Sequence, residues 1–108
     1  MMSAPKPPTA VYITDPSVAV GLLNEARNMN MEIPRDLSVL GFDDRDSRDY
    51  VSPKLTAICQ NAVDLGKEAF SRLAQFVQSS QSRESHQASA ATSWLELNQT
   101  TGPPAEMR

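Results

Sequence analysis

Residues 33–44 read Ile-Pro-Arg-Asp-Leu-Ser-Val-Leu-Gly-Phe-Asp-Asp, and this stretch carries the strongest structural signal in the chain. The run from Leu37 to Phe42 is nearly all apolar, and a pair of aspartates follows it, which is typical of a buried strand. Upstream, the run from Thr9 to Thr14 is short, apolar and rich in β-branched residues, and it predicts a second buried strand.

The segment between these two runs has the pattern of an amphipathic helix. Asp15 is a favourable N-cap, because its carboxylate accepts backbone N–H groups of the first turn, and Pro16 is favoured at the first helical position. The helix is expected to end near Met31, because the residue before Pro34 resists helical geometry. A strand, a helix and a strand within about 35 residues form a βαβ unit, so the strands are expected to be parallel with a right-handed crossover. The apolar stripe of the helix comprises Val18, Ala19, Leu22, Leu23, Ala26 and Met29.

Downstream, the pattern predicts a third strand at 55–60, a long helix at 62–78 and a last strand at 94–97, at an edge of the sheet. The fold class expected is α/β: a three-layer sandwich around a mostly parallel sheet. Residues 1–8 are expected to form a flexible lead and residues 100–108 an irregular tail. Residues 9–99 then form one lobe, in which the polar stretch 79–93 is a mobile loop.

Composition narrows the classes of partner. The net charge is −3 and no cluster of Lys and Arg is present, so direct DNA binding by this chain alone is not expected. The single cysteine, Cys59, cannot form an internal disulfide, which favours the cytoplasm. No apolar run approaches the roughly 20 residues of a membrane span, and the Pro-rich lead does not resemble a signal peptide, so no membrane partner is expected.

Polar residues follow three of the predicted strands: Thr14-Asp15, Asp43-Asp44 and Cys59-Gln60. Ligands of parallel α/β sheets bind at the carboxyl ends of the strands. Carboxylates and an amide suit a polyhydroxylated ligand, because they accept and donate several directed hydrogen bonds.

Each of these pairs also has a simpler interpretation. Asp15 is first a helix cap, and Cys59 is an ordinary strand-end residue rather than a nucleophile. Asp43 and Asp44 fit a solvated acidic turn, a paired-carboxylate acid/base site, or a magnesium or phospho-acceptor site with Asp15 as partner. No lysine follows a later strand, as a phosphoreceiver would require, so we expect no catalytic residue, cofactor or metal.

Five segments, in order and with matching spacing, resemble the LacI/GalR family of transcriptional regulators. Residues 8–21 resemble the family's "PTAV…(N/S)D–MALGAL", and residues 33–44 closely resemble "(V/I)PEDVSVVGFDD". Residues 50–60 resemble "YLTPPLTTVRQ", residues 65–66 match the "LG" of the following helix, and residues 97–104 resemble "LVVRESTAPP". The resemblance runs from about Pro8 to Pro104, and its most specific part is 33–44.

The resemblance implies one lobe of a type I periplasmic-binding-protein-like core. In the family, this core binds a small effector, often a sugar or nucleoside, between two lobes and dimerises, while a helix-turn-helix headpiece binds DNA. The chain matches most of the second lobe only, so DNA would be contacted only through a headpiece that it lacks. The resemblance implies that the chain is one lobe of a homodimer. The lobe is expected to bind a small polar effector, a carbohydrate, and binding is expected to shift the regulator between conformations. This chain alone is expected to bind effector weakly or not at all.

Carried over by position, Asp43 matches the family aspartate that bonds effector hydroxyls, and Gln60 matches a glutamine near the pocket. Asp15 falls where many members place a ligand-contacting Asn or Ser, but Pro16 replaces the usual Asp after it. Dimerisation in the family uses the positions of Val20, Leu23, Asn24 and Tyr50; alternatively, Val20 and Leu23 pack on the sheet. The competing hypotheses are a fragment of a secreted solute-binding protein, an enzyme or phosphoreceiver, and a truncated reading frame without independent activity.

Overall fold

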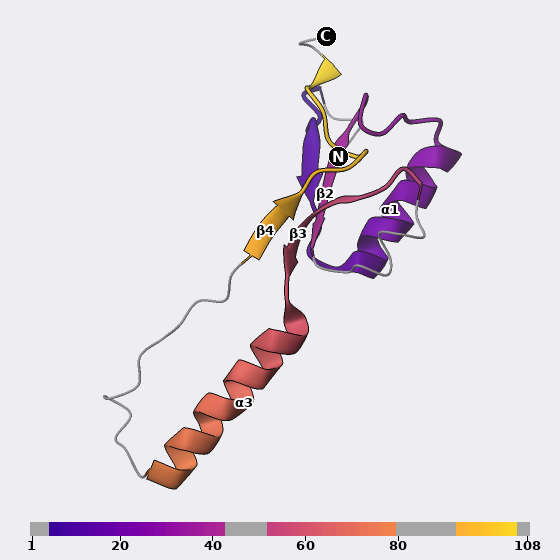
Figure 1. Ribbon diagram of the computed structural model, residues 1–108. Helices are drawn as coiled ribbons and strands as arrows, with labels where there is room; N and C mark the ends of the chain where they lie inside the picture. Colours follow the sequence, from indigo (N-terminus) through magenta and orange to yellow (C-terminus); the bar gives the residue numbers. More distant parts are fainter. Residues whose placement is uncertain (1–4, 43–51, 80–92, 106–108) are drawn as a thin grey trace. The chain divides into compact units, whose positions relative to one another are not determined.

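The computed structural model describes residues 5–42, 52–79 and 93–105 (Figure 1). The elements follow in the order β1 (Ala10–Tyr12), α1 (Pro16–Asn28), β2 (Ser38–Phe42), β3 (Thr56–Gln60), α3 (Ala62–Ser79) and β4 (Ser93–Glu96). Each predicted helix and strand is therefore present within a few residues of its expected position. Most of the predicted mobile loop, residues 80–92, falls outside the part of the chain that is described.

The strands form one four-stranded sheet in the order β1-β2-β3-β4. β1 pairs with β2, and β2 with β3, both in parallel. β4 runs the opposite way, because the N–H of Gln99 donates to the carbonyl of Lys54 at 2.8 Å, whereas the earlier residue Glu96 meets the later residue Cys59. The α/β class with a mostly parallel sheet is thus confirmed, with an antiparallel strand at one edge.

Both ends of α1 are closed by local hydrogen bonds. At the start, Oδ1 of Asp15 accepts from the backbone N–H of Ser17 at 2.9 Å, as an N-cap does. At the end, Asn30 adopts a left-handed φ of 57°, and the N–H of Met31 donates to the carbonyl of Ala26 at 2.8 Å. This is the Schellman arrangement, and it ends the helix at Asn28 rather than near Met31.

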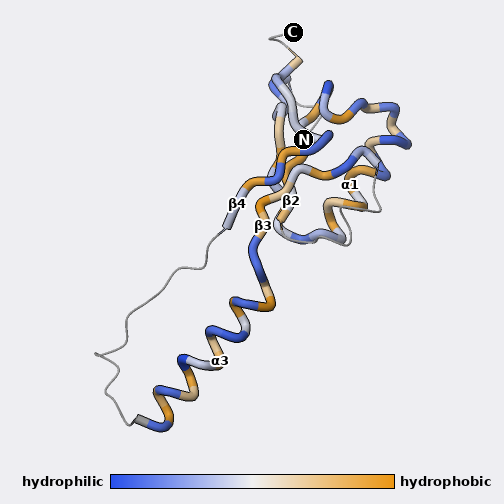
Figure 2. Tube along the Cα trace, in the orientation of Figure 1, coloured by the Kyte–Doolittle hydropathy of each residue, from blue (hydrophilic) through white to orange (hydrophobic). Residues whose placement is uncertain are grey.

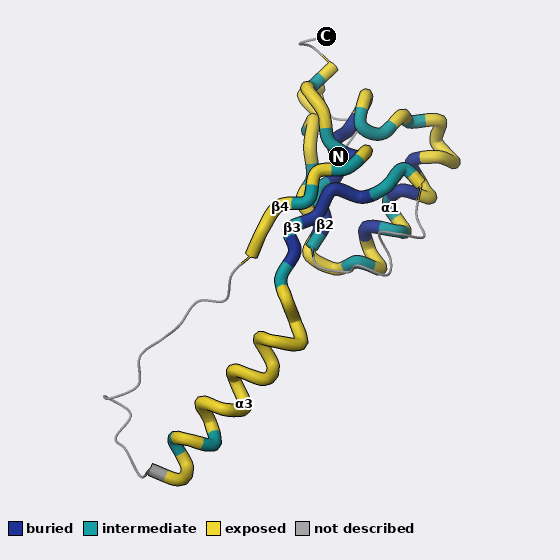
Figure 3. Tube along the Cα trace, in the orientation of Figure 1, coloured by how far each residue is buried: buried dark blue, intermediate teal, exposed yellow. Residues whose placement is uncertain are grey.

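One face of the sheet and one face of α1 form the core. Ala19, Leu23 and Ala26 of α1 are buried, with exposed fractions of 0%, 4% and 5%. Leu23 belongs to the same cluster as Val39 in the centre of β2, and the two helix alanines allow the helix to approach closely. Figure 3 shows the buried positions gathered in β2, β3 and this side of α1.

Gly41 shows why the middle of the 33–44 stretch needs a residue without a side chain. A Cβ placed on Gly41 would lie 2.5 Å from Cδ2 of Leu55, well inside van der Waals contact. Leu55 is only 2% exposed, so it has little room to move away. The leucine that precedes β3 therefore packs directly on the backbone of β2.

The turn before β2 is held by its own charged residues. The carboxylate of Asp36 accepts from the N–H of Glu32 at 2.8 Å, and the N–H of Asp36 donates back to the carbonyl of Glu32. The hydrogen bond and the negative charge of Glu32, with a further contribution from Asp36, raise the pKa of Arg35. These bonds turn the chain after α1 so that Leu37 enters the core.

The segment after β4 completes the sheet at the amino ends of β2 and β3. Thr100 is fully buried, and its hydroxyl donates to the carbonyl of Val39 at 2.7 Å and accepts from the N–H of Thr56 at 2.8 Å. The carbonyl of Thr100 accepts from the N–H of Val39 at 2.8 Å. Residues 100–104 are irregular in backbone, yet Thr100 bridges two strands of the core.

α3 belongs to a second compact unit, Gln60–Ser93, whereas the sheet and α1 belong to a unit made of Met1–Cys59 and Trp94–Arg108. Asn61 caps α3, because its Oδ1 accepts from the N–H of Asp64 at 3.2 Å. Apolar and polar residues alternate with helical spacing along α3 (Figure 2), and none of its described side chains is classed as buried. The layer that α3 was expected to add to the sandwich stays a prediction.

Candidate functional site

The carboxyl ends of β1 and β2 lie beside each other at one edge of the sheet. In the register of the two strands, Tyr12 is opposite Leu40, and the N–H of Ile13 donates to the carbonyl of Leu40 at 2.8 Å. Asp15 follows the first strand, and Asp43 directly follows the last residue of the second, Phe42. The backbone therefore brings Asp15 and Phe42, the last residue of β2, to the same edge of the sheet, as expected for parallel strands.

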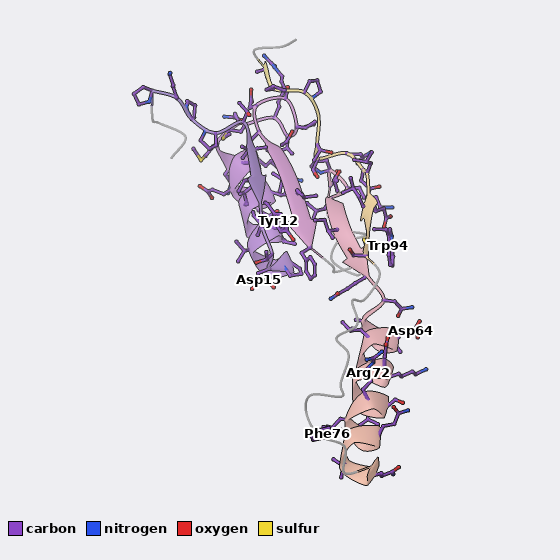
Figure 4. All side chains as sticks on the ribbon, turned by 90° about the vertical axis from the view of Figure 1, so that its left-hand side faces the viewer. Tyr12, Asp15, Asp64, Arg72, Phe76 and Trp94 are labelled. Carbon is purple, nitrogen blue, oxygen red and sulfur yellow. The ribbon has the colours of Figure 1, made fainter. Side chains whose placement is uncertain are left out.

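Asp15 is exposed and lies at the end of β1, close to the first turn of α1 (Figure 4). Among the described residues, its carboxylate makes one hydrogen bond, from the N–H of Ser17 to Oδ1. A carboxylate can accept about four hydrogen bonds, so capping leaves acceptor positions for a ligand hydroxyl. The cap interpretation is confirmed, and the ligand role is compatible with it.

The structure says less about the other two predicted ligand residues, Asp43 and Gln60. Asp43 and Asp44 fall in residues 43–51, which the structure does not describe, and so does Tyr50. Gln60 is the half-buried last residue of β3 and the first residue of the second compact unit, so its position is described only within that unit. Their contribution to the site stays a prediction.

The start of β4 adds two residues that the sequence analysis did not assign to the site. Because β4 is antiparallel to β3, its first residues lie at the carboxyl end of β3. There the thiol of Cys59 donates to Oε2 of Glu96 at 3.6 Å, and Cys59 itself is 2% exposed. Trp94, two positions before Glu96, is 42% exposed and offers an aromatic surface near the same edge (Figure 4).

These two residues show what the local pattern lacked. The sequence predicts that Trp94 and Glu96 belong to one short strand. It does not predict the direction of that strand, and the direction decides which end of the sheet the two residues reach. The carboxylate of Glu96 and the ring of Trp94, both at one edge, can accept hydrogen bonds and cover an apolar ligand face. Within residues 5–42, 52–79 and 93–105, no group of three or more His, Cys, Asp or Glu residues could hold a metal ion.

The predicted dimerisation residues divide between surface and core. Asn24 is exposed and Val20 is half-buried. They lie on the flank of α1 that also carries Arg27, whose Nη2 donates to the carbonyl of Ser52, just before β3, at 2.8 Å. Leu23 is different, because it faces the sheet and is only 4% exposed; it packs in its own lobe, and its expected place on a partner surface is corrected.

Comparison with known proteins identifies the family. A profile of the periplasmic binding protein-like domain matches residues 1–96. The chain belongs to this family. No helix in the described part of this chain is long and apolar enough to cross a membrane.

Within the family, the chain is similar to transcriptional regulators. The HTH-type transcriptional repressor CytR of Escherichia coli (strain K12) is 38% identical over 69 residues, which cover 64% of this chain and 20% of the repressor. The chain therefore spans about a fifth of the length of this curated relative. The resemblance to LacI/GalR regulators is confirmed, and these relatives also confirm the prediction that the chain is not an enzyme.

Solved structures show the same fold. A LacI transcriptional regulator from Bacillus cereus subsp. cytotoxis NVH 391-98 superposes with a TM-score of 0.85 at 27% identity, covering 94% of this chain and 35% of that one. A LacI family regulator from Enterococcus faecium with bound ribose gives a TM-score of 0.72 at 26% identity, covering 91% and 36%. The α/β lobe is therefore the family's periplasmic-binding-protein-like fold.

Proposed function

We propose that this chain is an effector-binding and dimerisation lobe of a LacI-type transcriptional regulator, and that its effector is a small carbohydrate. The observation that carries the proposal is the sheet edge at which Asp15 lies beside the carboxyl end of β2, the strand that Asp43 follows in the sequence. DNA would be contacted through the headpiece of such a regulator and not through these 108 residues. The regulator would act in the cytoplasm, where its operator is located.

Three residues are proposed to contact the effector: Asp15, Asp43 and Gln60. The carboxylates would accept hydrogen bonds from sugar hydroxyls, and the amide would both donate and accept. Asp15 is already held in place by the N–H of Ser17, which reduces the entropy lost when a ligand binds. The ribose bound to the Enterococcus faecium regulator supports a pentose as the first ligand to test.

The proposed mechanism is linkage between effector and operator. An effector shifts a conformational equilibrium only by the difference between its affinities for the two states. This lobe would provide part of the effector contacts, and the strength of these contacts would differ between the two conformations of the regulator. A second lobe would provide the remaining effector contacts, so this chain alone should bind effector weakly.

Titration with ribose, followed by amide chemical shifts of the 108-residue chain, tests the ligand residues. We expect shifts at Asp15, Asp43 and Gln60 with a Kd on the order of 10 mM, since half a site retains only a few kcal/mol. Asp43→Ala should remove the shifts at the other two residues, whereas Asp64→Ala on α3 should leave them unchanged. If ribose at about 100 mM moves none of the three amides, the ligand assignment is wrong.

Dimerisation is proposed through the flank of α1 that carries Val20 and Asn24, together with Tyr50. Val20→Glu would place a charge in that interface, so it should weaken a dimer of this kind at least tenfold, about 1.4 kcal/mol or more. Sedimentation velocity over a range of concentrations measures the change. A dimer that is insensitive to Val20→Glu would exclude this flank.

The role in regulation is tested by sequencing and translating the DNA immediately upstream of the Met1 codon. We expect an in-frame helix-turn-helix and a first lobe. A stop codon followed by a separate ribosome-binding site would instead mean a free-standing lobe. The regulatory mechanism would then fail for this chain, and a remnant without independent activity would be the better interpretation.

A further inference from the structure

A hydrogen bond joins the end of α1 to the chain that leads into β3. Nη2 of Arg27, in the last turn of α1, donates to the backbone carbonyl of Ser52 at 2.8 Å. Ser52 is the first described residue after the connection that leaves β2 at Phe42. The guanidinium of Arg27 therefore holds the point at which this connection returns to the lobe.

Side-chain packing does little to fix the position of Ser52. A recess of about 300 Å³ lies between the end of α1 and the Ser52-Pro53 segment, and Leu23 and Ala26 are among the residues that line it. Well-packed contacts leave few voids larger than a water molecule. The contact between Ser52 and α1 therefore depends on the hydrogen bond from Arg27.

From Lys54 onward, the chain is held by a different part of the lobe. The N–H of Lys54 donates to Oε1 of Gln99, and the N–H of Gln99 donates to the carbonyl of Lys54, both at 2.8 Å. These two bonds join Lys54 to the segment after β4. Ser52 and Pro53 thus come just before a firmly held residue, and Arg27 holds them on the side of α1.

Arg27 also lies on the flank of α1 that is proposed to dimerise. Val20, Asn24 and Arg27 are spaced four and three residues apart, so they follow one another along the same side of the helix. Asn24 and Arg27 are exposed and Val20 is half-buried. The hydrogen bond therefore places Ser52 at the end of this row of side chains.

We propose that Arg27 is a positioning residue for the dimer; this inference rests on the dimerisation proposed above. By holding the carbonyl of Ser52, Arg27 joins the chain before β3 to the flank of Val20 and Asn24, so that helix and chain offer one continuous surface to the second copy. Tyr50, the remaining residue of the proposed interface, precedes Ser52 by two residues. Covalent geometry keeps the Cα atoms of Tyr50 and Ser52 within about 7.6 Å of each other, so a contact that fixes Ser52 also limits where Tyr50 lies.

Distance along α1 separates this role from effector binding. Arg27 comes twelve residues after Asp15, which is about 18 Å at 1.5 Å per residue. The carboxylate of Asp15 is held by its own hydrogen bond, from the N–H of Ser17. Loss of the bond from Arg27 to Ser52 should therefore weaken dimerisation and leave the effector contacts of Asp15 unchanged.

Sedimentation velocity of the variant Arg27→Met tests the role, because methionine keeps a long side chain that favours helix but has no donor. Both copies in a dimer must have Ser52 in place, so the Kd rises with the inverse square of the fraction in which it is held. A fall of that fraction from nearly one to about one third raises the Kd about ninefold. Arg27→Lys keeps a charged donor and should raise the Kd less than about threefold. Arg72→Met, the same chemical change on α3, is the matched control and should leave the Kd unchanged.

NMR relaxation of the monomer distinguishes positioning from a direct contact between Arg27 and the second copy. At a concentration well below the Kd, the heteronuclear NOE of the Ser52 amide reports how firmly this residue is held on the picosecond-to-nanosecond timescale. Arg27→Met should lower this NOE, whereas Val20→Glu should not, because it removes no bond to Ser52. Circular dichroism and urea unfolding establish that each variant is folded.

Four results would overturn the inference: an unchanged Ser52 NOE in Arg27→Met, a Kd that rises less than about twofold, an equal rise in Arg27→Lys, or loss of the ribose-induced shift at Asp15. If Val20→Glu still weakens the dimer in those cases, the proposed function stands without this inference. A chain that stays monomeric at about 1 mM refutes the proposed dimerisation itself, and the role of Arg27 with it.

Discussion

Replacing Thr100 with valine should cost about 2–4 kcal/mol of unfolding free energy, although the two side chains have nearly the same shape. The hydroxyl of Thr100 is fully buried and bridges the carbonyl of Val39, at 2.7 Å, and the N–H of Thr56, at 2.8 Å. Valine fills the same space but leaves both backbone groups without this partner. A buried polar group left unsatisfied costs about 1–3 kcal/mol, and the variant creates up to two of them.

Urea unfolding measures this cost, with circular dichroism and the fluorescence of the single tryptophan, Trp94, as two probes. Since small domains hold about 5–15 kcal/mol in total, the loss is a large fraction of the stability and should lower the Tm by roughly 10–30 °C. Thr100→Ser keeps the hydroxyl and removes one methyl group, so it should cost about 1 kcal/mol.

Thr101→Val is the matched control. The hydroxyl of Thr101 is half-buried and lies 3.0 Å from the hydroxyl of Thr56, which still accepts from the N–H of Asn98 at 2.9 Å. No backbone group loses its partner, so the change should be below about 1 kcal/mol. The reasoning is refuted if Thr100→Val costs no more than Thr101→Val, or less than Thr100→Ser.

Three further changes test other parts of the lobe by the same unfolding measurement. Gly41→Ala should destabilise by about 1–3 kcal/mol, because the new Cβ would lie 2.5 Å from Leu55; Gly21→Ala has open space around it and should stabilise by up to about 1 kcal/mol. Asp15→Ala should cost about 1 kcal/mol through loss of the N-cap, whereas Asp15→Asn, which keeps the acceptor, should change stability by a few tenths; equal losses would mean that the cap is not the cause. Asn30→Val should cost about 1–2 kcal/mol at a φ of 57°, and Asn30→Gly should be neutral or stabilising; the opposite order would contradict the left-handed helix end.

Sequence alone predicted the helices, the strands and their parallel order, because these depend on local apolar spacing and on short connections. The predicted end of α1, near Met31, lies too late in the chain, because it relies on Pro34 as the terminating signal. The operative residue is Asn30, which tolerates left-handed backbone and ends the helix earlier. An asparagine favours left-handed backbone, so Asn30 is a recognisable helix end in the sequence, but other nearby residues, such as Pro34, are also typical of helix ends.

Long-range contacts were less predictable. Nothing in the run Asn98 to Gly102 indicates that Thr100 is buried, because its partners lie 61 and 44 residues away. The same holds for Glu96, whose position at the carboxyl end of β3 follows from the direction of β4. Leu23 was assigned to a partner surface by resemblance, while its spacing with Ala19 and Ala26 already indicated the core.

At the candidate site, the part that follows from backbone topology was predictable. Parallel strands place Asp15 beside the end of β2, and its capping role follows from local chemistry. The contribution of Asp43 depends on residues 43–51, and that of Gln60 on the second compact unit. Both remain predictions that the ribose titration addresses.

The bridge made by Thr100 also has a consequence for the order of folding. β1, α1 and β2 are contiguous in the sequence and can form early, since closing short loops costs little conformational entropy. The N–H of Val39 and the N–H of Thr56 receive their partner only when a residue from the far end of the chain arrives. The parallel pair of β2 and β3 should therefore mature in a late, slow step, and the amides of those two residues should be the last in the sheet to become protected against hydrogen exchange.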